Sequence, residues 1–494
     1  MKRTSKSWAS SIVCFSLLSL LLFGCASYHT RSHKVQSAFA NADLPRAASE
    51  VNKSRILKKN RNRLLFYLEA GTIESVRGNY AASNDYFEKA YLIIEDEKNN
   101  LGGEFLRYTM NPMMTDYTPE NHEVIYIHYY KALNYLRLGE LDKAMVEVKR
   151  MDNKIKRLDA KYQNKNKFQD DALIHLVMGL VYDAGADYNN AFIAYKNALK
   201  LYEGPYRTEL GVAIPDQLKS DLIRTAYLSG FREEGRRFEE KFGIKYKPVP
   251  AGSGTAIVIW QNGLTPIKTE AGFTFTSQPG VGGNVTFNSD EFVDGFSFPE
   301  PTDNNEKTSL NELRTFRVVL PKYTSRPPVF NAATLSISDG TNYNLYLAED
   351  VEKVARQCLN DRLLREMSTV LIRIAIKKGT EIALRKAAES AKKDNEKAGL
   401  EAAALGVMLF NTFSEKADTR NWQTLPNAIY YTRIVKQPGN YQATFKFSGR
   451  KSDERAYQIP ITANNTYFFV QHTLGAEQVY PGHTPVSQMG ADVD

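Results

Sequence analysis

The sequence predicts a multidomain α + β protein: an N-terminal array of paired helices, then an antiparallel β-sandwich-like domain that carries a long helical hairpin insert. Two observations predict this order. Small and aromatic residues recur at helical spacing in residues 50–245, and runs of β-branched and aromatic residues separated by turns follow from residue 255. Residues 246–254 are rich in proline and glycine, so we interpret them as a linker between the two parts.

Residues 1–24 have the three-part pattern of a secretory signal peptide. Lys2 and Arg3 begin it, and a short apolar run closes at Gly24, just before Cys25. The run is far shorter than the roughly 20 residues that cross a bilayer, which disfavours a permanent transmembrane helix. We therefore expect the segment to be cleaved.

The four residues Leu22-Phe23-Gly24-Cys25 resemble the cleavage and lipid-attachment box of bacterial lipoproteins, although Phe23 is bulkier than the residue usual there. The resemblance implies that Cys25 becomes an acylated N-terminus, and that Ala26 directs the protein to the outer membrane. A plain cleaved signal is the alternative. Several acyl chains would make a firm membrane anchor.

Composition narrows the class of protein further. The net charge is +8, of which the signal peptide supplies three positive charges, so the remaining surplus is too small for a typical nucleic-acid binder. Cys14 leaves with the signal and Cys25 is the lipidation site, which leaves Cys358 alone. No intramolecular disulfide is then possible, and we expect Cys358 to be buried packing.

Residues 25–49 are expected to form a tether and a first helix, and residues 50–245 a set of helical repeats. The first copy combines Gly71 with Phe87 at the spacing of a tetratricopeptide repeat, further copies follow, and the last one is degenerate enough to be a capping pair. The small residues should let paired helices approach, and the aromatic residues should fill the space that they leave. The residues assigned to repeat packing are Gly71, Gly78, Tyr80, Phe87, Ala90, Ala132, Tyr135, Gly139, Ala144, Gly179, Tyr182, Tyr188, Ala191, Tyr195 and Ala198.

Repeat arrays of this kind bind peptides or protein segments on a concave face and perform no chemistry. Polar residues one helical turn from the packing positions are therefore candidate contacts with a partner. They are Asn84, His128, Lys131 and Asn134.

Residues 255–349 and 418–473 together predict the strand-rich domain. Between them, residues 350–417 carry apolar residues at helical spacing, which predicts a helical hairpin broken near Asp394. Residues 474–494 are predicted to be a flexible tail. The predicted strands are residues 255–260, 273–276, 284–287, 316–320, 333–337, 343–347, 429–435, 441–447, 456–461 and 466–471.

The junction before the last strands reads Ala-Asp-Thr-Arg-Asn-Trp-Gln-Thr-Leu-Pro, residues 417–426. With the lipid-attachment box and the repeats, it resembles an uncharacterised family of bacterial lipoproteins that share this junction and have no assigned activity. Its members tend to be encoded near lipoproteins that activate cell-wall synthases, which implies a role in envelope assembly. From the residues alone, we expect Asp418 and Arg420 to pair across the turn while Trp422 anchors it in the core.

The sequence offers no catalytic or metal site. Its seven histidines lack metal-ligand spacing, and no Gly-x-Ser-x-Gly elbow is present. The Ser390 to Lys393 match to Ser-x-x-Lys lies in a predicted lysine-rich helix, where such a match arises easily by chance. We therefore expect neither enzymatic activity nor a cofactor.

Two interpretations of function remain. The first is an outer-membrane lipoprotein, anchored through Cys25 and facing the periplasm, whose repeats bind an envelope protein as a scaffold or assembly factor. The second is a carbohydrate- or peptidoglycan-binding lipoprotein that reads glycan through its β domain. Neither involves nucleic acid.

Overall fold

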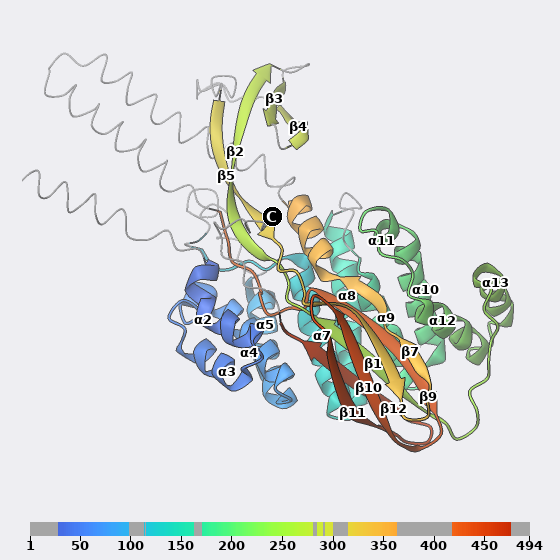
Figure 1. Ribbon diagram of the computed structural model, residues 1–494. Coiled ribbons are helices and arrows are strands. Elements are labelled where there is room, and N and C mark those ends of the chain that lie inside the picture. Colours follow the sequence, from blue (N-terminus) through green and yellow to red (C-terminus); the bar gives the residue numbers. More distant parts are fainter. Residues whose placement is uncertain are drawn as a thin grey trace, which may run out of the picture.

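The computed structural model describes residues 28–97, 113, 115–162, 170–279, 284–289, 292–299, 315–362 and 417–475 (Figure 1). The signal peptide, Cys25, the insert beyond residue 362 with Asp394 and the Ser390 to Lys393 match, and the tail beyond residue 475 lie outside these residues. The predictions made for them stay predictions.

Paired antiparallel helices build the N-terminal part, and successive pairs stack side by side (Figure 1). The pairs are α2 (Tyr28–Ala40) with α3 (Leu44–Lys53), α4 (Arg63–Val76) with α5 (Tyr80–Glu97), α7 (Asn121–Arg137) with α8 (Leu141–Tyr162), α9 (Ala172–Ala184) with α10 (Tyr188–Glu203), and α12 (Asp216–Leu228) with α13 (Arg232–Phe242). The first helices of three pairs, α7, α9 and α12, contact the β strands, and those of two others, α2 and α4, contact residues 419–423. Short helical turns η1 (Asn60–Asn62) and α11 (Pro205–Thr208) connect neighbouring pairs.

The array begins earlier than the sequence indicated. We expected a tether and one helix before residue 50, but residues 28–53 form the full pair α2 and α3. Tyr28 and Phe39 are completely buried, and Asp43 caps α3 by accepting a hydrogen bond from the backbone N–H of Arg46 at 3.2 Å. The two helices pack because each has an apolar face, which a flexible tether would lack.

Glycine and aromatic residues meet where paired helices approach. A Cβ atom on Gly71 would lie 2.7 Å from the Phe87 ring, and one on Gly179 would lie 2.3 Å from the Tyr195 ring. The glycines are therefore required by close packing. Of the residues assigned to repeat packing, the buried ones are Gly71, Phe87, Ala90, Ala132, Ala144, Gly179, Ala191, Tyr195 and Ala198, and the half-buried ones are Tyr80, Tyr135, Tyr182 and Tyr188.

Turns within the pairs use a left-handed residue. Gly78 and Gly139 have φ values of 85° and 74°, which glycine adopts at no steric cost. Between α9 and α10 the left-handed residue is Ala186, with φ of 56°, and not its neighbour Gly185.

Two sheets pack face to face as a sandwich. One has the order β12-β1-β9-β8 and the other β11-β10-β6-β7. We expected antiparallel pairing throughout, but β1 and β12 run parallel, with Thr255 opposite Thr466. The strands are β1 (Gly254–Asn262), β6 (Phe330–Ile337), β7 (Asn342–Asn344), β8 (Tyr346–Asp350), β9 (Ala428–Lys436), β10 (Gly439–Gly449), β11 (Asp453–Ile461) and β12 (Thr466–Thr473).

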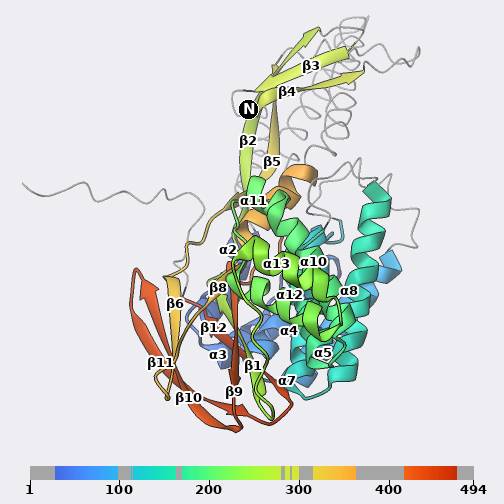
Figure 2. The same cartoon turned by 90° about the vertical axis from the view of Figure 1, so that its right-hand side faces the viewer.

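The sheet that contains β1 is the middle layer, with helices on one face and the second sheet on the other (Figure 2). Alternation along β1 explains this arrangement. Val258 and Trp260 belong to the core between the sheets, whereas Ile257 and Ile259 belong to the core shared with the helices. The helical array and the β domain are therefore joined through one hydrophobic core and are not independent units.

A long arm leaves this body (Figures 1 and 2). It consists of β2 (Ile267–Pro279) paired with β5 (Thr315–Thr324), and its far end carries β3 (Asn284–Ser289) and β4 (Phe292–Pro299). β4 was not predicted from the sequence. After β8, residues 351–362 form the described start of the insert as a helix, in which Cys358 is buried.

Candidate functional site

The junction segment, residues 417–427, lies against the first helices of the array. This is the face on which repeat arrays commonly hold a peptide, and here the protein's own chain occupies it. Trp422 is completely buried, and its ring centroid lies 5.6 Å from that of Phe87 and 5.8 Å from that of Tyr130. The segment thus covers part of the inner side of the array.

Two glutamates of the array accept backbone hydrogen bonds from the junction segment. The N–H of Trp422 donates to Oε1 of Glu123 at 2.8 Å, and the N–H of Gln423 donates to Oε1 of Glu69 at 2.9 Å. The indole Nε1–H of Trp422 donates to Oγ1 of Thr72 at 2.9 Å. Because the segment forms no strand here, these side chains satisfy backbone groups that would otherwise be buried without a partner.

Arg420 fixes the start of the junction segment. Its guanidinium forms an ion pair with Asp418, with 2.7 Å between NH2 and Oδ2, as the sequence led us to expect. It also donates to Oδ1 of Asn62 at 3.0 Å and to the carbonyl of Thr115 at 3.0 Å, and it lies over the Tyr117 ring. Arg420 therefore also connects the segment to η1 and to the residues before α7.

Arg326 joins the arm to the same region. The Arg326 side chain is buried; its Nε donates to the carbonyl of Thr265 at 2.6 Å, and its NH2 donates to the carbonyl of Gln423. Burial lowers the pKa of Arg326 to about 10, although the charge of nearby Glu69 opposes this. Burial raises the pKa of Glu69 to about 7, against hydrogen bonds from Gln423 and Gln36.

A second cation from the β domain reaches the array at its other end. Nε of Arg433, on β9, lies 2.6 Å from Oδ1 of Asp221, and its NH2 lies 2.6 Å from Oδ2 of Asp183. Arg224 shares Asp183, and all of these side chains are largely buried. The ion pairs connect α9, α12 and the middle sheet.

A third buried pair connects the arm and the insert to the array. Nζ of Lys268 lies 2.5 Å from Oε1 of Glu120, and NH1 of Arg362 lies 3.0 Å from the same oxygen. Burial favours the neutral acid, but the two cations outweigh it and lower the pKa of Glu120 to about 2. Lys268 and Arg433 thus each bring a cation of the β domain to a buried acidic side chain of the array.

The four candidate partner contacts lie inside the protein. Oδ1 of Asn84 accepts from Nδ2 of Asn134 at 2.9 Å, and His128 and Lys131 both pair with Glu147, at 2.7 and 2.9 Å. All four are 1–6% exposed. Burial lowers the pKa of His128, although its hydrogen bond with Glu147 acts in the opposite direction. That these residues bind a partner stays a prediction, and their polar atoms already join α5, α7 and α8.

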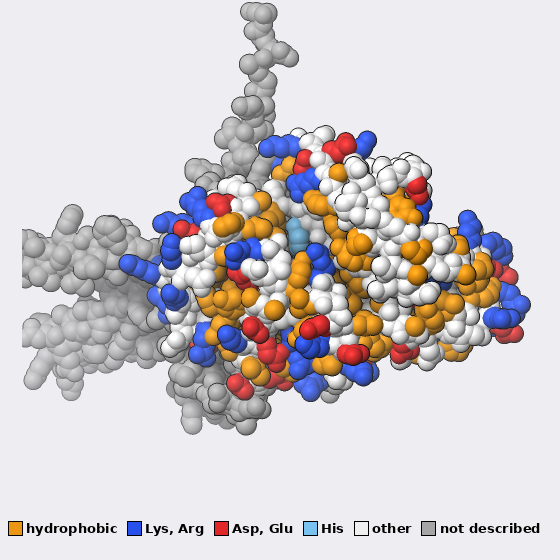
Figure 3. Space-filling model, turned by 90° about the horizontal axis from the view of Figure 1, so that it is seen from below, with side chains coloured by type: hydrophobic (Ala, Val, Ile, Leu, Met, Phe, Trp, Pro, Cys, Tyr) orange, Lys and Arg blue, Asp and Glu red, His pale blue; other side chains and the backbone are white. Residues whose placement is uncertain are grey.

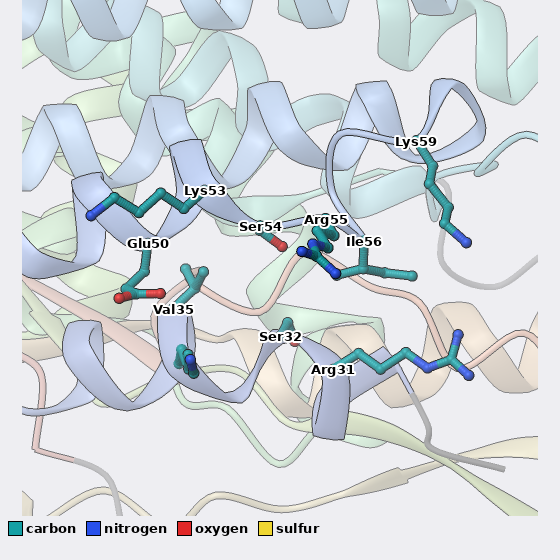
Figure 4. Close-up of a pocket in the computed structure, with 10 residues that line it drawn as sticks. Arg31, Ser32, Val35, Glu50, Lys53, Ser54, Arg55, Ile56 and Lys59 are labelled. Carbon is teal, nitrogen blue, oxygen red and sulfur yellow. The ribbon is translucent and has the colours of Figure 1, made fainter. Parts of the chain in front are cut away.

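An open cavity lies at the N-terminal end of the array, between α2, α3 and the loop that follows α3 (Figure 4). Its volume is about 740 Å³. Val35 and Ile56 provide buried apolar surface, and among the described residues that line it Glu50 is the one acid. The basic residues that line it are Arg31, Lys34, Lys53, Arg55 and Lys59.

The sequence analysis identified neither the buried acidic residues on the first helices of the pairs nor the basic cavity. Glu69 and Asp183 each interrupt a strongly apolar helix face, which was a readable signal of a buried polar contact. The run of basic residues between Arg31 and Arg63 was a second signal: this stretch holds nine lysines and arginines and two acids.

Two absences hold for the described residues. No group of histidine, cysteine and acidic residues among them is arranged to hold a metal ion. Likewise, none of the helices in the described ranges has the length and apolar character that crossing a membrane requires.

Comparison with known proteins gives partial structural matches. No family model matches the chain, and no curated protein matches it. The MamA protein matches with 15% identity over 44% of this chain and 95% of its own, at a TM-score of 0.27. The apo form of RapI matches with 13% identity over 43% and 52%, at 0.31, and a tetratricopeptide repeat protein from Parabacteroides merdae with 13% identity over 45% and 81%, at 0.20. At these values, our assignment of repeats rests on the helix pairs described above.

Proposed function

We propose that this chain is a lipid-anchored protein of the bacterial envelope that acts as a scaffold for a partner protein. Cys25 would carry the acyl chains, and the body would face the periplasm from the outer membrane. One observation carries the proposal: the array and the β domain share one core, and the junction segment locks them together. A single large body of this kind is suited to presenting a surface.

The partner would bind the outer side of the array, because the junction segment and the middle sheet already cover the inner side. The second helices of successive pairs form this outer side. They carry exposed apolar residues: Leu92 on α5 is 51% exposed, Val146 on α8 is 50% exposed, and Ile193 on α10 is 47% exposed. Binding there would leave the buried contacts described above intact.

Site-specific photo-crosslinking tests the scaffold. A photoreactive amino acid would replace Leu92, Val146 or Ile193 in the full-length protein, in cells. Control positions are Lys446 and Glu454, which are 60% and 61% exposed on the outer sheet. We expect a discrete protein adduct from at least one array position and none from the controls. Adducts from no array position would contradict the scaffold.

The anchor has its own test. Mass spectrometry of the purified membrane-bound protein should find acyl chains on Cys25, and a Cys25→Ala form should lose them and be washed from the membrane fraction by high salt. If the array adducts persist in the Cys25→Ala form, the scaffold does not depend on the anchor. Binding of the unanchored chain to purified sacculi, through the sandwich, would instead favour a glycan reader.

A further inference from the structure

We propose that the basic cavity at the N-terminal end of the array binds the phosphate headgroups of anionic phospholipids and docks that end of the protein on the membrane. The inference goes beyond the scaffold and takes its orientation from the proposed attachment at Cys25. We call this the basic docking face, defined by Lys34, Lys53, Arg55 and Lys59 around the cavity.

Charge at this end is strongly unbalanced. Residues 28–63 carry a net charge of +7, whereas the whole chain carries +8. Figure 3 shows Lys and Arg side chains at the left end of the surface, where α2 and α3 lie in Figure 1, and a second group at the right end. A field of one sign at one end of a molecule attracts an anionic surface rather than a single acidic side chain.

The four cations are available to a ligand. Each is exposed, and within the described residues none of them takes part in an ion pair. Figure 4 shows Arg55 near the centre of the cavity, Lys53 toward one end and Lys59 toward the other. Four cations spread around one opening suit several phosphates better than one, because a single phosphate could not contact all of them.

The cavity lies close to Cys25 along the chain, which favours a membrane as the source of those phosphates. Only residues 26 and 27 separate Cys25 from the start of α2, and three extended residue steps span roughly 10 Å. Lys34 follows the first residue of α2 by less than two helical turns. An acylated Cys25 would therefore hold this end of the array close to the headgroups, within reach of electrostatic attraction at physiological salt, where the screening length is about 8 Å.

The test uses the chain from residue 25 onward with Cys25→Ala, which contains every described residue and lacks acyl chains. Flotation with neutral phosphatidylcholine vesicles is compared with vesicles that contain 30% phosphatidylglycerol. We expect binding to the anionic vesicles only, and weaker binding as salt rises. Since each basic residue near such a surface contributes about fivefold in affinity, Lys34→Gln/Lys53→Gln/Arg55→Gln/Lys59→Gln should reduce binding by a hundredfold or more.

A matched control changes the same charge at the opposite end of the molecule. Arg232, Arg236, Arg237 and Lys247 are exposed, and the first three lie on α13, at the opposite end of the molecule from α2 and α3 in Figure 1. Changing all four of these residues to glutamine should reduce binding to the anionic vesicles by less than about tenfold. Equal thermal melting of both variants would show that each is folded.

The inference fails if the two variants lose binding equally, if neutral and anionic vesicles bind alike, or if purified sacculi bind while anionic vesicles do not. The outcome is separable from that of the proposed anchor. Acylated Cys25 in cells with no vesicle preference overturns the docking face alone, whereas vesicle binding with an unacylated Cys25 overturns the anchor alone.

Discussion

Replacing Trp422 by alanine should weaken the attachment of the junction segment to the array. The indole is completely buried against Phe87 and Tyr130. Truncation of a buried tryptophan removes its transfer free energy and leaves a cavity, which together cost about 3–5 kcal/mol. The backbone hydrogen bond from Trp422 to Glu123 survives the change, so we expect a loss of about 4 kcal/mol in the free energy of unfolding.

Trp422→Phe is the matched variant. It keeps a ring against Phe87 and Tyr130 but loses the indole N–H that donates to Thr72 and Thr424. A neutral hydrogen bond contributes about 1 kcal/mol net, and the smaller ring adds a modest packing loss, so we expect a cost of about 1–2 kcal/mol. The ratio of the two losses separates packing from hydrogen bonding.

Urea unfolding followed by circular dichroism at 222 nm measures both variants without depending on tryptophan fluorescence. The midpoint should fall in the order wild type, Trp422→Phe, Trp422→Ala, with the slope m unchanged. A loss below about 1 kcal/mol for Trp422→Ala would refute the reasoning, because the segment would then not hold the array and the β domain together. Equal losses in the free energy of unfolding for the two variants would contradict the expected packing contribution of the ring.

Three further outcomes are expected. The carboxyl of Glu69 keeps its proton to about pH 7 in the folded state but only to about pH 4.5 when unfolded, so the free energy of unfolding should fall as the pH rises from 4.5 to 7. Glu69→Gln should remove this loss. In urea titrations the variant should therefore gain about 3 kcal/mol relative to wild type at pH 8 and nothing at pH 4. Arg433→Met should cost about 3–5 kcal/mol in the same assay, because it leaves buried carboxylates short of a partner. Gly179→Ala should cost about 1–3 kcal/mol, seen as a lower melting temperature, because its Cβ would collide with the Tyr195 ring.

Controls for these outcomes come from the same chain. Lys446→Gln removes an exposed pair with Glu454 and should change stability by less than about 1 kcal/mol. Gly185→Ala places its Cβ at an ordinary 3.5 Å and should be tolerated. A wild-type stability that does not change between pH 5 and pH 8 would contradict the interpretation of Glu69, and near-neutral Arg433→Met would show that the charged network is not needed for stability.

Local patterns allowed the helices and strands to be predicted. Gly71 and Gly179 predict close helix pairs because a small residue opposite an aromatic one is a contact between neighbours in sequence, and the short apolar run from Thr255 to Trp260 predicts a strand. The strand β4 escaped because Phe292 to Pro299 includes a glycine and an aspartate that weaken the strand pattern. The pair Asp418 and Arg420 was readable for the same local reason, since only one residue separates them.

The sequence by itself therefore determined the repeat type and most of the strands, because each depends on residues close together in the chain. Only the tertiary structure decided what fills the face of the array. Trp422 meets Thr72, and Arg433 meets Asp183, across hundreds of residues. Such contacts follow from how the middle sheet packs on the helices, and a buried glutamate or arginine carries no local mark of the partner that folding will bring to it.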